Sequence, residues 1–153
     1  MLIKGSFAPL FEAVDGEGSI LKLGDFRGKQ RVVLFFYPGD FTMHCTKEAC
    51  LFRDNLSSFT TLNAMPMGIS PDNPESHQQF AGKYGLDYPL LSDPAKKIAK
   101  LYDVGKAFGV FSSQRVTYVI NTIGIIIGTV TGQFNHKVHV YKAMEFLKSP
   151  EVR

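Results

Sequence analysis

The sequence alternates between short runs of consecutive apolar residues and segments in which apolar residues recur at helical spacing. The apolar runs have the length and the β-branched or aromatic enrichment of strands. Because consecutive apolar positions indicate burial on both faces of a sheet, we expect helices on both faces. The predicted strands are RVVLFFY (31–37), MPMGIS (65–70), YPLLS (88–92), VTYVIN (116–121) and GIIIGTV (124–130).

Helical patterns separate the first strands and follow the last one. In SPDNPESHQQF, Asp72 or Asn73 is expected to cap a helix that begins at Pro74, and SDPAKKIAKLY repeats this arrangement. The predicted helices cover about 42–60, 74–84, 94–104 and 138–148.

The order of these elements predicts the fold class. An N-terminal β portion around DGEGSILKL precedes a β-α-β-α-β-α alternation, and VINTIG predicts a hairpin turn between the last two strands. Alternation followed by a hairpin predicts an α/β fold with a mixed central sheet flanked by helices and an N-terminal β extension. We interpret residues 1–153 as a single domain.

Composition and charge exclude several classes of protein. With 44% hydrophobic and 20% charged residues, the chain resembles soluble globular proteins, and its longest apolar runs are far shorter than the roughly 20 residues of a membrane-spanning helix. The net charge of +3 is mild, and no Lys/Arg cluster exceeds the KK at 96–97, so neither a membrane nor a nucleic acid is expected as partner. The first twenty residues lack the features of a signal or transit peptide, which predicts a cytoplasmic protein or the mature form of an organelle-targeted one.

The segment PGDFTMHCTKEAC (38–50) contains both cysteines of the chain. It leads from a predicted buried strand into a helix for which Asp40 or Thr42 is the expected cap, so Cys45 falls in the first helical turn. Free amide N–H groups and the positive end of the helix dipole favour a thiolate at such a position. Cys45 is therefore the predicted nucleophile.

Cys50 lies five residues further along the same predicted helix. Helix geometry then places its side chain roughly 140° around the helix axis from that of Cys45, with the two Cα atoms nearly 9 Å apart. A disulfide needs a Cα separation of about 4.4–6.8 Å. Either the two cysteines never bond, or the helix unwinds each time that they do.

Other interpretations of these cysteines remain open to different degrees. Cys50, among the apolar neighbours of EACLF, also fits a small buried hydrophobic residue. A zinc site of His44, Cys45 and Cys50 is disfavoured, because no second ligand pair has the usual spacing, and the C-x-x-C motif of dithiol exchange is absent from the sequence. No metal ion is expected.

The segment FFYPGDFTMHCTKEACLFRD resembles the active-site segment of the peroxiredoxins. Pro38, Thr42 and Cys45 match their pattern Pro-x-x-x-Thr-x-x-Cys, and Cys50 matches the second cysteine of the bacterioferritin-comigratory or Q-type branch. Arg115, in SSQRVTYVIN, stands where that family carries its active-site arginine. The similarity extends over essentially the whole chain.

This resemblance implies a thioredoxin-like fold and a thiol-dependent peroxidase that needs no cofactor. It implies that Cys45 reduces a hydroperoxide and becomes a sulfenic acid, which Cys50 captures as a disulfide for reduction by thioredoxin or glutaredoxin. It further implies that Thr42 bonds peroxide and thiolate, that Arg115 stabilises the thiolate, and that Pro38 shields the site from water. The expected oligomeric state is a monomer. A protein thiol-disulfide oxidoreductase and a non-enzymatic peroxide sensor are the alternatives.

The sequence also departs from the family pattern. Met43 and His44 stand where the family often has Pro-Gly before the cysteine. His44 is disfavoured as a base for Cys45, because adjacent helical residues point in different directions. The remaining histidines fall in predicted helix starts or loops, where we expect them to be solvated; they are His77, His136 and His139.

Overall fold

The computed structural model describes residues 1–107 and 112–149. Within these ranges, a seven-stranded sheet has the strand order β2-β1-β5-β4-β3-β8-β9, and β6 and β7 form a separate two-stranded sheet. The strands are β1 (Glu12–Asp15), β2 (Ile20–Lys22), β3 (Arg31–Phe36), β4 (Ala64–Ser70), β5 (Leu90–Ser92), β6 (Lys106–Ala107), β7 (Ser112–Ser113), β8 (Val116–Ile120) and β9 (Ile126–Thr131).

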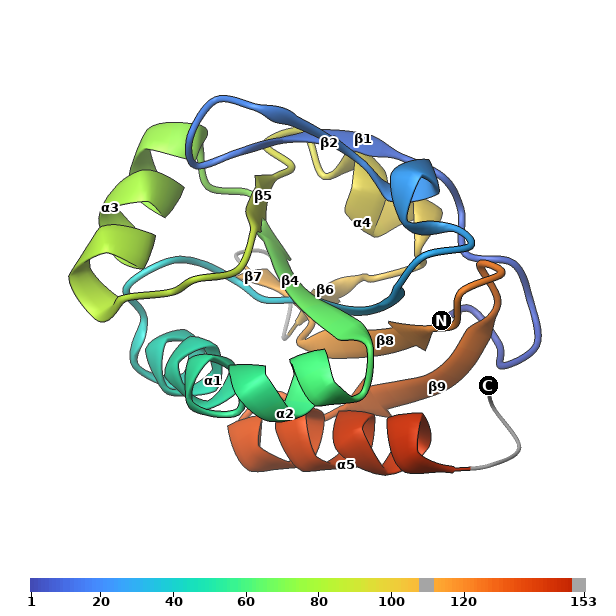
Figure 1. Cartoon of the computed structure of the whole chain (residues 1–153). Coiled ribbons are helices and arrows are strands. Elements are labelled where there is room, and N and C mark those ends of the chain that lie inside the picture. Colours follow the sequence, from blue (N-terminus) through green and yellow to red (C-terminus); the bar gives the residue numbers. More distant parts are fainter. Residues whose placement is uncertain (108–111, 150–153) are drawn as a thin grey trace.

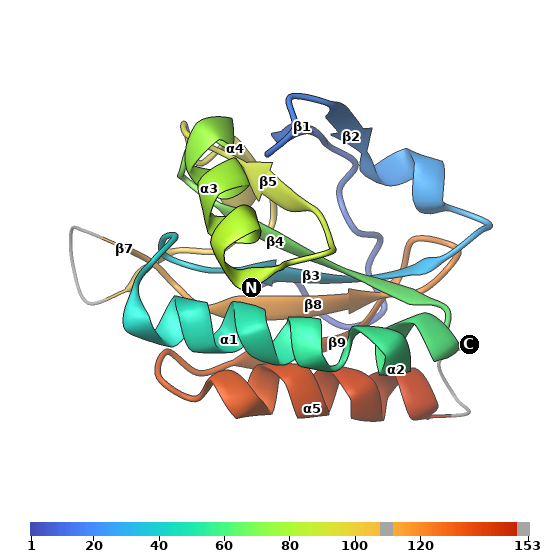
Figure 2. The same ribbon diagram turned by 60° about the vertical axis from the view of Figure 1, so that its left-hand side comes forward.

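Helices cover both faces of the large sheet, as predicted (Figure 1). One face carries α1, α2, α3 and α5, and the other carries α4, the short 3₁₀ helix η1 and the N-terminal segment. In Figure 2, α1 and α5 lie side by side below β8. The helices are η1 (Leu23–Phe26), α1 (Met43–Asp54), α2 (Leu56–Thr61), α3 (Pro74–Tyr84), α4 (Lys97–Leu101) and α5 (His136–Lys148).

The central strand β3 shows why its sequence is apolar at consecutive positions. Val33 and Phe35 pack into the core beneath α1 and α5, whereas Leu34 and Phe36 pack into the core on the α4 side. A strand that contributes to two cores cannot alternate apolar with polar residues. The prediction of a sheet buried on both faces is confirmed.

The sheet is mixed, as predicted. β3, β4 and β5 are parallel, because helices connect them. β8 pairs antiparallel with both β3 and β9, so the predicted hairpin of the last two strands is confirmed. The N-terminal β extension is the antiparallel pair of β1 and β2, which joins the sheet through β5.

The helix predicted over 42–60 is interrupted. It ends at Asp54, and α2 begins at Leu56 after Asn55 adopts φ −105° and ψ 10°. The side-chain amide of Asn55 donates to the carbonyl oxygen of Leu51 at 2.8 Å. Asparagine competes in this way with the backbone of its own helix, which breaks the element.

The two expected Pro-initiated helices have different starts. Asn73 caps α3 by accepting from the amide of Ser76, and Pro74 is the first helical residue, as predicted. The second helix, predicted over 94–104, comprises Lys97–Leu101 alone. Its preceding residue Lys96 is left-handed, at φ 57°, so the chain turns before the helix begins. Asp93 caps this later start by accepting from the amides of residues 98 and 99.

No helix among the described residues is both long enough and apolar enough to cross a membrane. This agrees with the short apolar runs of the sequence.

The packing of β9 against α5 generates a stability prediction. A methyl group on Gly128 would overlap the ring of Phe146. We expect Gly128→Ala to lower the free energy of unfolding by about 1–3 kcal/mol, because the helix must shift or the ring must leave its rotamer. Gly82 in α3 has no atom within 4 Å of the corresponding position, and Gly82→Ala should instead stabilise by up to about 1 kcal/mol. Urea denaturation followed by circular dichroism measures both, and equal effects would contradict the assigned contact.

Candidate functional site

Cys45 lies in the first turn of α1, directly after the loop that leaves the carboxyl end of β3. The helix opens with the amide of Thr46 donating to the carbonyl oxygen of Thr42 at 2.8 Å. The Cys45 side chain is 1% exposed and packs in the core on the α1 side of the sheet. Its sulfur is therefore almost completely shielded from solvent.

Arg115 lies beside Cys45 although 70 positions separate them in sequence. It immediately precedes β8, which pairs antiparallel with β3 so that Val116 faces Phe36 at the end from which the Cys45 loop departs. The guanidinium Nη2 donates to Cys45 Sγ at 3.2 Å, and the side chain is 3% exposed. Sheet register thus brings together the two residues that the sequence motif associated.

Two further groups hold Arg115 in place. Its Nε donates to the carbonyl oxygen of Gln133 at 2.8 Å, and its own amide donates to Gln133 Oε1 at 3.0 Å. Its Nη1 donates to Glu48 Oε1 at 2.7 Å. The planar fork of a guanidinium suits such a bridge, because separate N–H groups serve the sulfur and the carboxylate.

Glu48 was not identified from the sequence, although it lies one helical turn after Cys45. Residues three apart are neighbours on a helix surface, which is the signal that could have found it. Burial raises the pKa of the Glu48 carboxyl to about 7, and Arg115 offsets part of that rise. Its Oε2 is buried with no hydrogen-bond partner. One guanidinium therefore faces two acidic groups, a thiol and a carboxyl.

His139 on α5 is fully buried beside Glu48, so the expectation that it is solvated is wrong. Its Nε2 lies 2.8 Å from the carbonyl oxygen of Gly132, and its Nδ1 lies 2.8 Å from Thr117 Oγ1 and 3.9 Å from Glu48 Oε2. A carbonyl only accepts, so Nε2 carries the proton. Burial lowers the pKa of His139 to about 4, partly offset by the bond to Gly132, and the ring is neutral at pH 7.

Thr42 and Pro38 lie in the loop that precedes Cys45. Thr42 occupies the N-cap position, as predicted, but its side chain makes no capping bond. Its hydroxyl instead donates to the carbonyl oxygen of Gly39 at 3.1 Å, and the residue is exposed. Pro38 is half-buried at the start of the loop.

Cys50 is half-buried in the same uninterrupted helix as Cys45, and the two thiols are free. Burial raises the pKa of the Cys50 thiol, although Arg53 partly offsets this effect. Burial therefore favours the protonated thiol at Cys50. At Cys45, by contrast, the sulfur faces the positive charge of Arg115.

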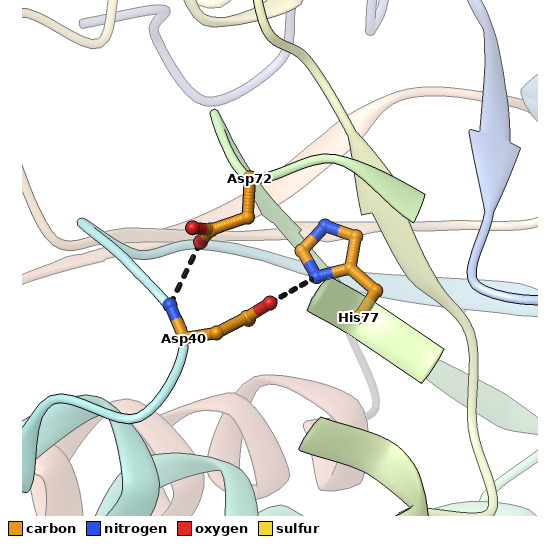
Figure 3. Close-up of side chains that lie close together, drawn as sticks. All are labelled: Asp40, Asp72 and His77. Carbon is orange, nitrogen blue, oxygen red and sulfur yellow. Dashed lines mark hydrogen bonds and ion pairs between the residues drawn. The ribbon is translucent and has the colours of Figure 1, made fainter. Parts of the chain in front are cut away.

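Asp40 does not cap α1, the other option from the sequence. Its buried carboxylate lies 2.8 Å from Nδ1 of His77, a fully buried histidine that was expected to be solvated (Figure 3). The sequence suggested Asp40 only as a helix cap and His77 as a solvated residue, because a polar residue in a loop or at a helix start usually faces water.

Met43 and His44 occupy the first helical positions before Cys45. Met43 is exposed. The ring of His44 packs edge-on against Phe134, with 5.5 Å between the ring centroids. The departure from the family pattern thus adds an apolar and aromatic rim beside the buried sulfur.

Comparisons with known proteins agree with this geometry. The sequence profile described as the AhpC/TSA family matches residues 5–128. The chain is 42% identical over 147 residues to the chloroplastic peroxiredoxin Q of Gentiana triflora, covering 95% of this chain and 67% of the relative. It is 41% identical over 148 residues to a putative peroxiredoxin of Mycobacterium tuberculosis, covering 92% of each.

Solved structures show the same fold. The crystal structure of peroxidoxin BcpB from Mycobacterium tuberculosis superposes with a TM-score of 0.91 at 33% identity, covering 100% of this chain and 99% of that one. A PrxQ of Xylella fastidiosa superposes with a TM-score of 0.88 at 26% identity, covering 97% of this chain and 96% of that one.

The chain therefore belongs to the AhpC/TSA family, with the thioredoxin-like fold of the peroxiredoxins. Its enzymatic class is that of the thiol-dependent peroxidases, and its relatives include peroxiredoxins of the Q type, which confirms the resemblance seen in the sequence.

The buried histidine generates a pH prediction. The unfolded chain takes up a proton at His139 near pH 6.5, whereas the folded protein resists that proton until about pH 4. The free energy of unfolding contributed by His139 is thus fully present above pH 6.5 and is lost as the pH falls towards 4. The difference in the free energy of unfolding between the wild type and His139→Gln should therefore fall by about 2–3 kcal/mol when the pH is lowered from 7 to 4.5. Urea titrations at both pH values measure it, and a pH-independent difference would contradict the neutral buried ring.

Proposed function

We propose that Cys45 is the peroxidatic cysteine of this peroxidase. Its thiolate attacks one oxygen of a hydroperoxide, hydrogen peroxide or an organic hydroperoxide. The S–O bond forms as the O–O bond breaks, sulfur supplies two electrons, and the departing oxygen leaves as water or an alcohol after taking a proton. Cys45 becomes a sulfenic acid.

The contact between Arg115 and Cys45 is the single observation that carries this proposal. A guanidinium that is always charged and lies 3.2 Å from the sulfur stabilises a thiolate in a site from which water is excluded. Arg115 also donates through Nη1 to Glu48. When the Glu48 carboxyl is protonated, the thiolate of Cys45 is, among the residues that the structure describes, the one negative charge that the guanidinium contacts. In this mechanism, Arg115 also stabilises the charge that develops on the attacked peroxide.

Thr42 and Pro38 complete the proposed site. The Thr42 hydroxyl donates to Gly39 and keeps its lone pairs for a peroxide that approaches Cys45 from the exposed side of the loop. Pro38, half-buried at the loop start, shields the sulfur from water.

Cys50 is the proposed resolving cysteine. Its thiol attacks the sulfenic sulfur of Cys45, a disulfide forms, and the hydroxyl leaves as water. An intact helix separates the two Cα atoms by about 9 Å, so the first turns of α1 must unwind for the bond to form. Thioredoxin or glutaredoxin then returns both thiols by disulfide exchange. We expect the enzyme to act as a monomer, in the cytoplasm or as the mature form of an organelle-targeted protein.

The burial of Cys45 argues against a protein thiol-disulfide oxidoreductase. A sulfur on a side chain that is 1% exposed admits a small peroxide, whereas a protein disulfide has to approach in line with the attacking sulfur. A peroxide sensor would use the same chemistry with slow turnover. The second-order rate of Cys45 oxidation and the turnover with a reductant distinguish these functions.

A substitution of Thr42 tests the assigned site. Thr42→Val keeps the shape of the side chain but deletes the hydroxyl, and we expect peroxide turnover to fall by about 100-fold. Because the hydroxyl makes no capping bond, the free energy of unfolding should change by no more than about 1 kcal/mol. Thr42→Ser should retain most of the activity. Near-normal turnover by Thr42→Val in a steady-state assay would rule out this role.

A substitution of Cys50 tests the catalytic cycle. Cys50→Ser should consume one peroxide per molecule and stop at a sulfenic acid, seen by mass spectrometry as one added oxygen. The wild type should instead lose two hydrogens and turn over with thioredoxin or glutaredoxin. Oxidised wild type should also show faster amide exchange across residues 42–52.

Two outcomes would reject local unwinding even if peroxidase activity survives. One is a disulfide between two chains, detected on a non-reducing gel. The other is unchanged amide protection across residues 42–52 in the oxidised protein.

A further inference from the structure

A buried hydrogen-bonded cluster holds the loop that precedes Cys45. Its centre is the carboxylate of Asp40, two residues before Thr42 (Figure 3). Asp40 Oδ1 accepts from the hydroxyl of Tyr37 at 2.6 Å. Asp40 Oδ2 accepts from the hydroxyl of Ser76 at 2.7 Å and lies 2.8 Å from Nδ1 of His77.

The two nitrogens of the His77 ring both face acceptors. Nε2 lies 3.0 Å from the carbonyl oxygen of Leu91, which has no proton to give. Nδ1 lies 2.8 Å from Asp40 Oδ2 and 3.4 Å from the Tyr37 hydroxyl. Nε2 therefore donates to the carbonyl oxygen, and a proton held between Nδ1 and the Asp40 carboxyl group links α3 to the loop. Burial, followed by the nearby Asp40 charge, raises the pKa of Tyr37 well above its ordinary value, so its hydroxyl remains a donor.

The backbone of the loop is fixed to the same cluster. The amide of Asp40 donates to Asp72 Oδ2 at 2.7 Å, and the Ser70 hydroxyl donates to the same oxygen at 2.7 Å. Asp72 follows β4, and His77 lies in α3, so the Cys45 loop is attached to two elements outside its own strand and helix. Asp40, Asp72 and His77 have ligand atoms within 4.8 Å of one another, but protein donors already serve these atoms, and no metal site is inferred.

The residue that follows Asp40 has a strained backbone. Phe41 adopts φ 65°, in the left-handed region that disfavours a bulky residue. Its ring packs against Phe80 of α3, with 5.0 Å between ring centroids. Such strain persists only where the surroundings over-determine the conformation. The bonds of Asp40 on one side and the start of α1 on the other impose it here.

We propose that the Asp40–His77 pair is a positioning clamp that holds the loop of residues 38–42 in its peroxide-reactive arrangement and opposes the unwinding of α1. This inference rests on the proposed roles of Cys45 and Cys50. The clamp fixes the loop at Asp40. After Cys45 is oxidised to a sulfenic acid, the loop therefore stays folded until the first turn of α1 unwinds.

The clamp then governs the fate of the sulfenic acid. In the folded loop, the sulfenate sulfur attacks a second hydroperoxide. A new S–O bond forms, the O–O bond breaks, and a sulfinic acid and an alcohol or water result. In the unwound loop, Cys50 forms the disulfide and releases water. A weaker clamp should therefore slow the first oxidation, speed disulfide formation and protect against sulfinic acid.

The test compares Asp40→Asn with the wild type in single-turnover mixing. Hydrogen peroxide is the probe, acid quenches the reaction, and mass spectrometry resolves the sulfenic, disulfide and sulfinic forms. Asp93→Asn is the matched control. Asp93, like Asp40, is a buried aspartate whose carboxylate is hydrogen-bonded, but it accepts from two backbone amides at the start of α4 instead of pairing with His77. His77→Gln removes the partner of Asp40, and Tyr37→Phe is a milder variant should either of the others fail to fold.

We expect Asp40→Asn and His77→Gln each to slow sulfenic acid formation and to raise the ratio of disulfide to sulfinic acid by about tenfold, as fits the loss of a charge-assisted hydrogen bond. The double variant should add little to either single one. Amide exchange across residues 38–46 of the reduced protein should accelerate in these variants but not in Asp93→Asn.

Two results separate failure of the clamp from failure of the proposed function. If the wild type forms the sulfenic acid and disulfide but Asp40→Asn changes the product ratio no more than Asp93→Asn does, the clamp is refuted while the function stands. If the wild type forms neither product, the roles of Cys45 and Cys50 fail, and the clamp fails with them.

Discussion

A buried guanidinium between a thiol and a carboxyl is the constraint on which the rest of this structure depends. Removing the charge of Arg115 from water is costly unless partners satisfy it, and a buried ion with a missing partner destabilises a protein strongly. The chain meets this cost with Cys45, Glu48 and the carbonyl oxygen of Gln133, which lie on α1 and on the turn between β9 and α5. The contacts of Arg115 thus join helix, sheet and turn at the cysteine.

The topology of the sheet explains why these groups meet. β8 pairs with β3 on one side and with β9 on the other, so the start of β8 lies beside both the end of β3 and the end of β9. The pairing of β8 with β3 brings Arg115 to the Cys45 loop, and the pairing of β8 with β9 brings Gln133 to Arg115. Packing of α5 against α1 then places the neutral ring of His139 beside Glu48. Arg115, Glu48 and His139 are buried because the start of β8, α1 and α5 carry them into the interior.

The reactive loop has a fixed side and a releasable side. Asp40 ties the loop to α3 and to the end of β4, whereas Cys45 belongs to a helix whose first turn has no side-chain cap. An uncapped helix end beside a strained residue is a place where local opening costs little. In the proposed cycle, reaction with peroxide needs the folded form and disulfide formation needs the open one. The energetic balance between the two sides therefore matters as much as the chemistry of the sulfur.

The sequence by itself determined the features that depend on neighbours along the chain. Consecutive apolar residues in β3 predicted a strand buried on both faces, Asn73 and Pro74 predicted the start of α3, and Pro38, Thr42 and Cys45 formed a contiguous motif at a helix start. Arg115 was found through the family resemblance alone, because nothing local in a strand-end arginine indicates a buried partner 70 positions away. Only the tertiary structure decided the roles of Glu48, His139, Asp40 and His77. The two histidines were expected to be solvated, Asp40 was expected only as a helix cap, and Glu48 was not identified. All four are buried because sheet register and helix packing supply each of them with a distant partner that removes the cost of leaving water.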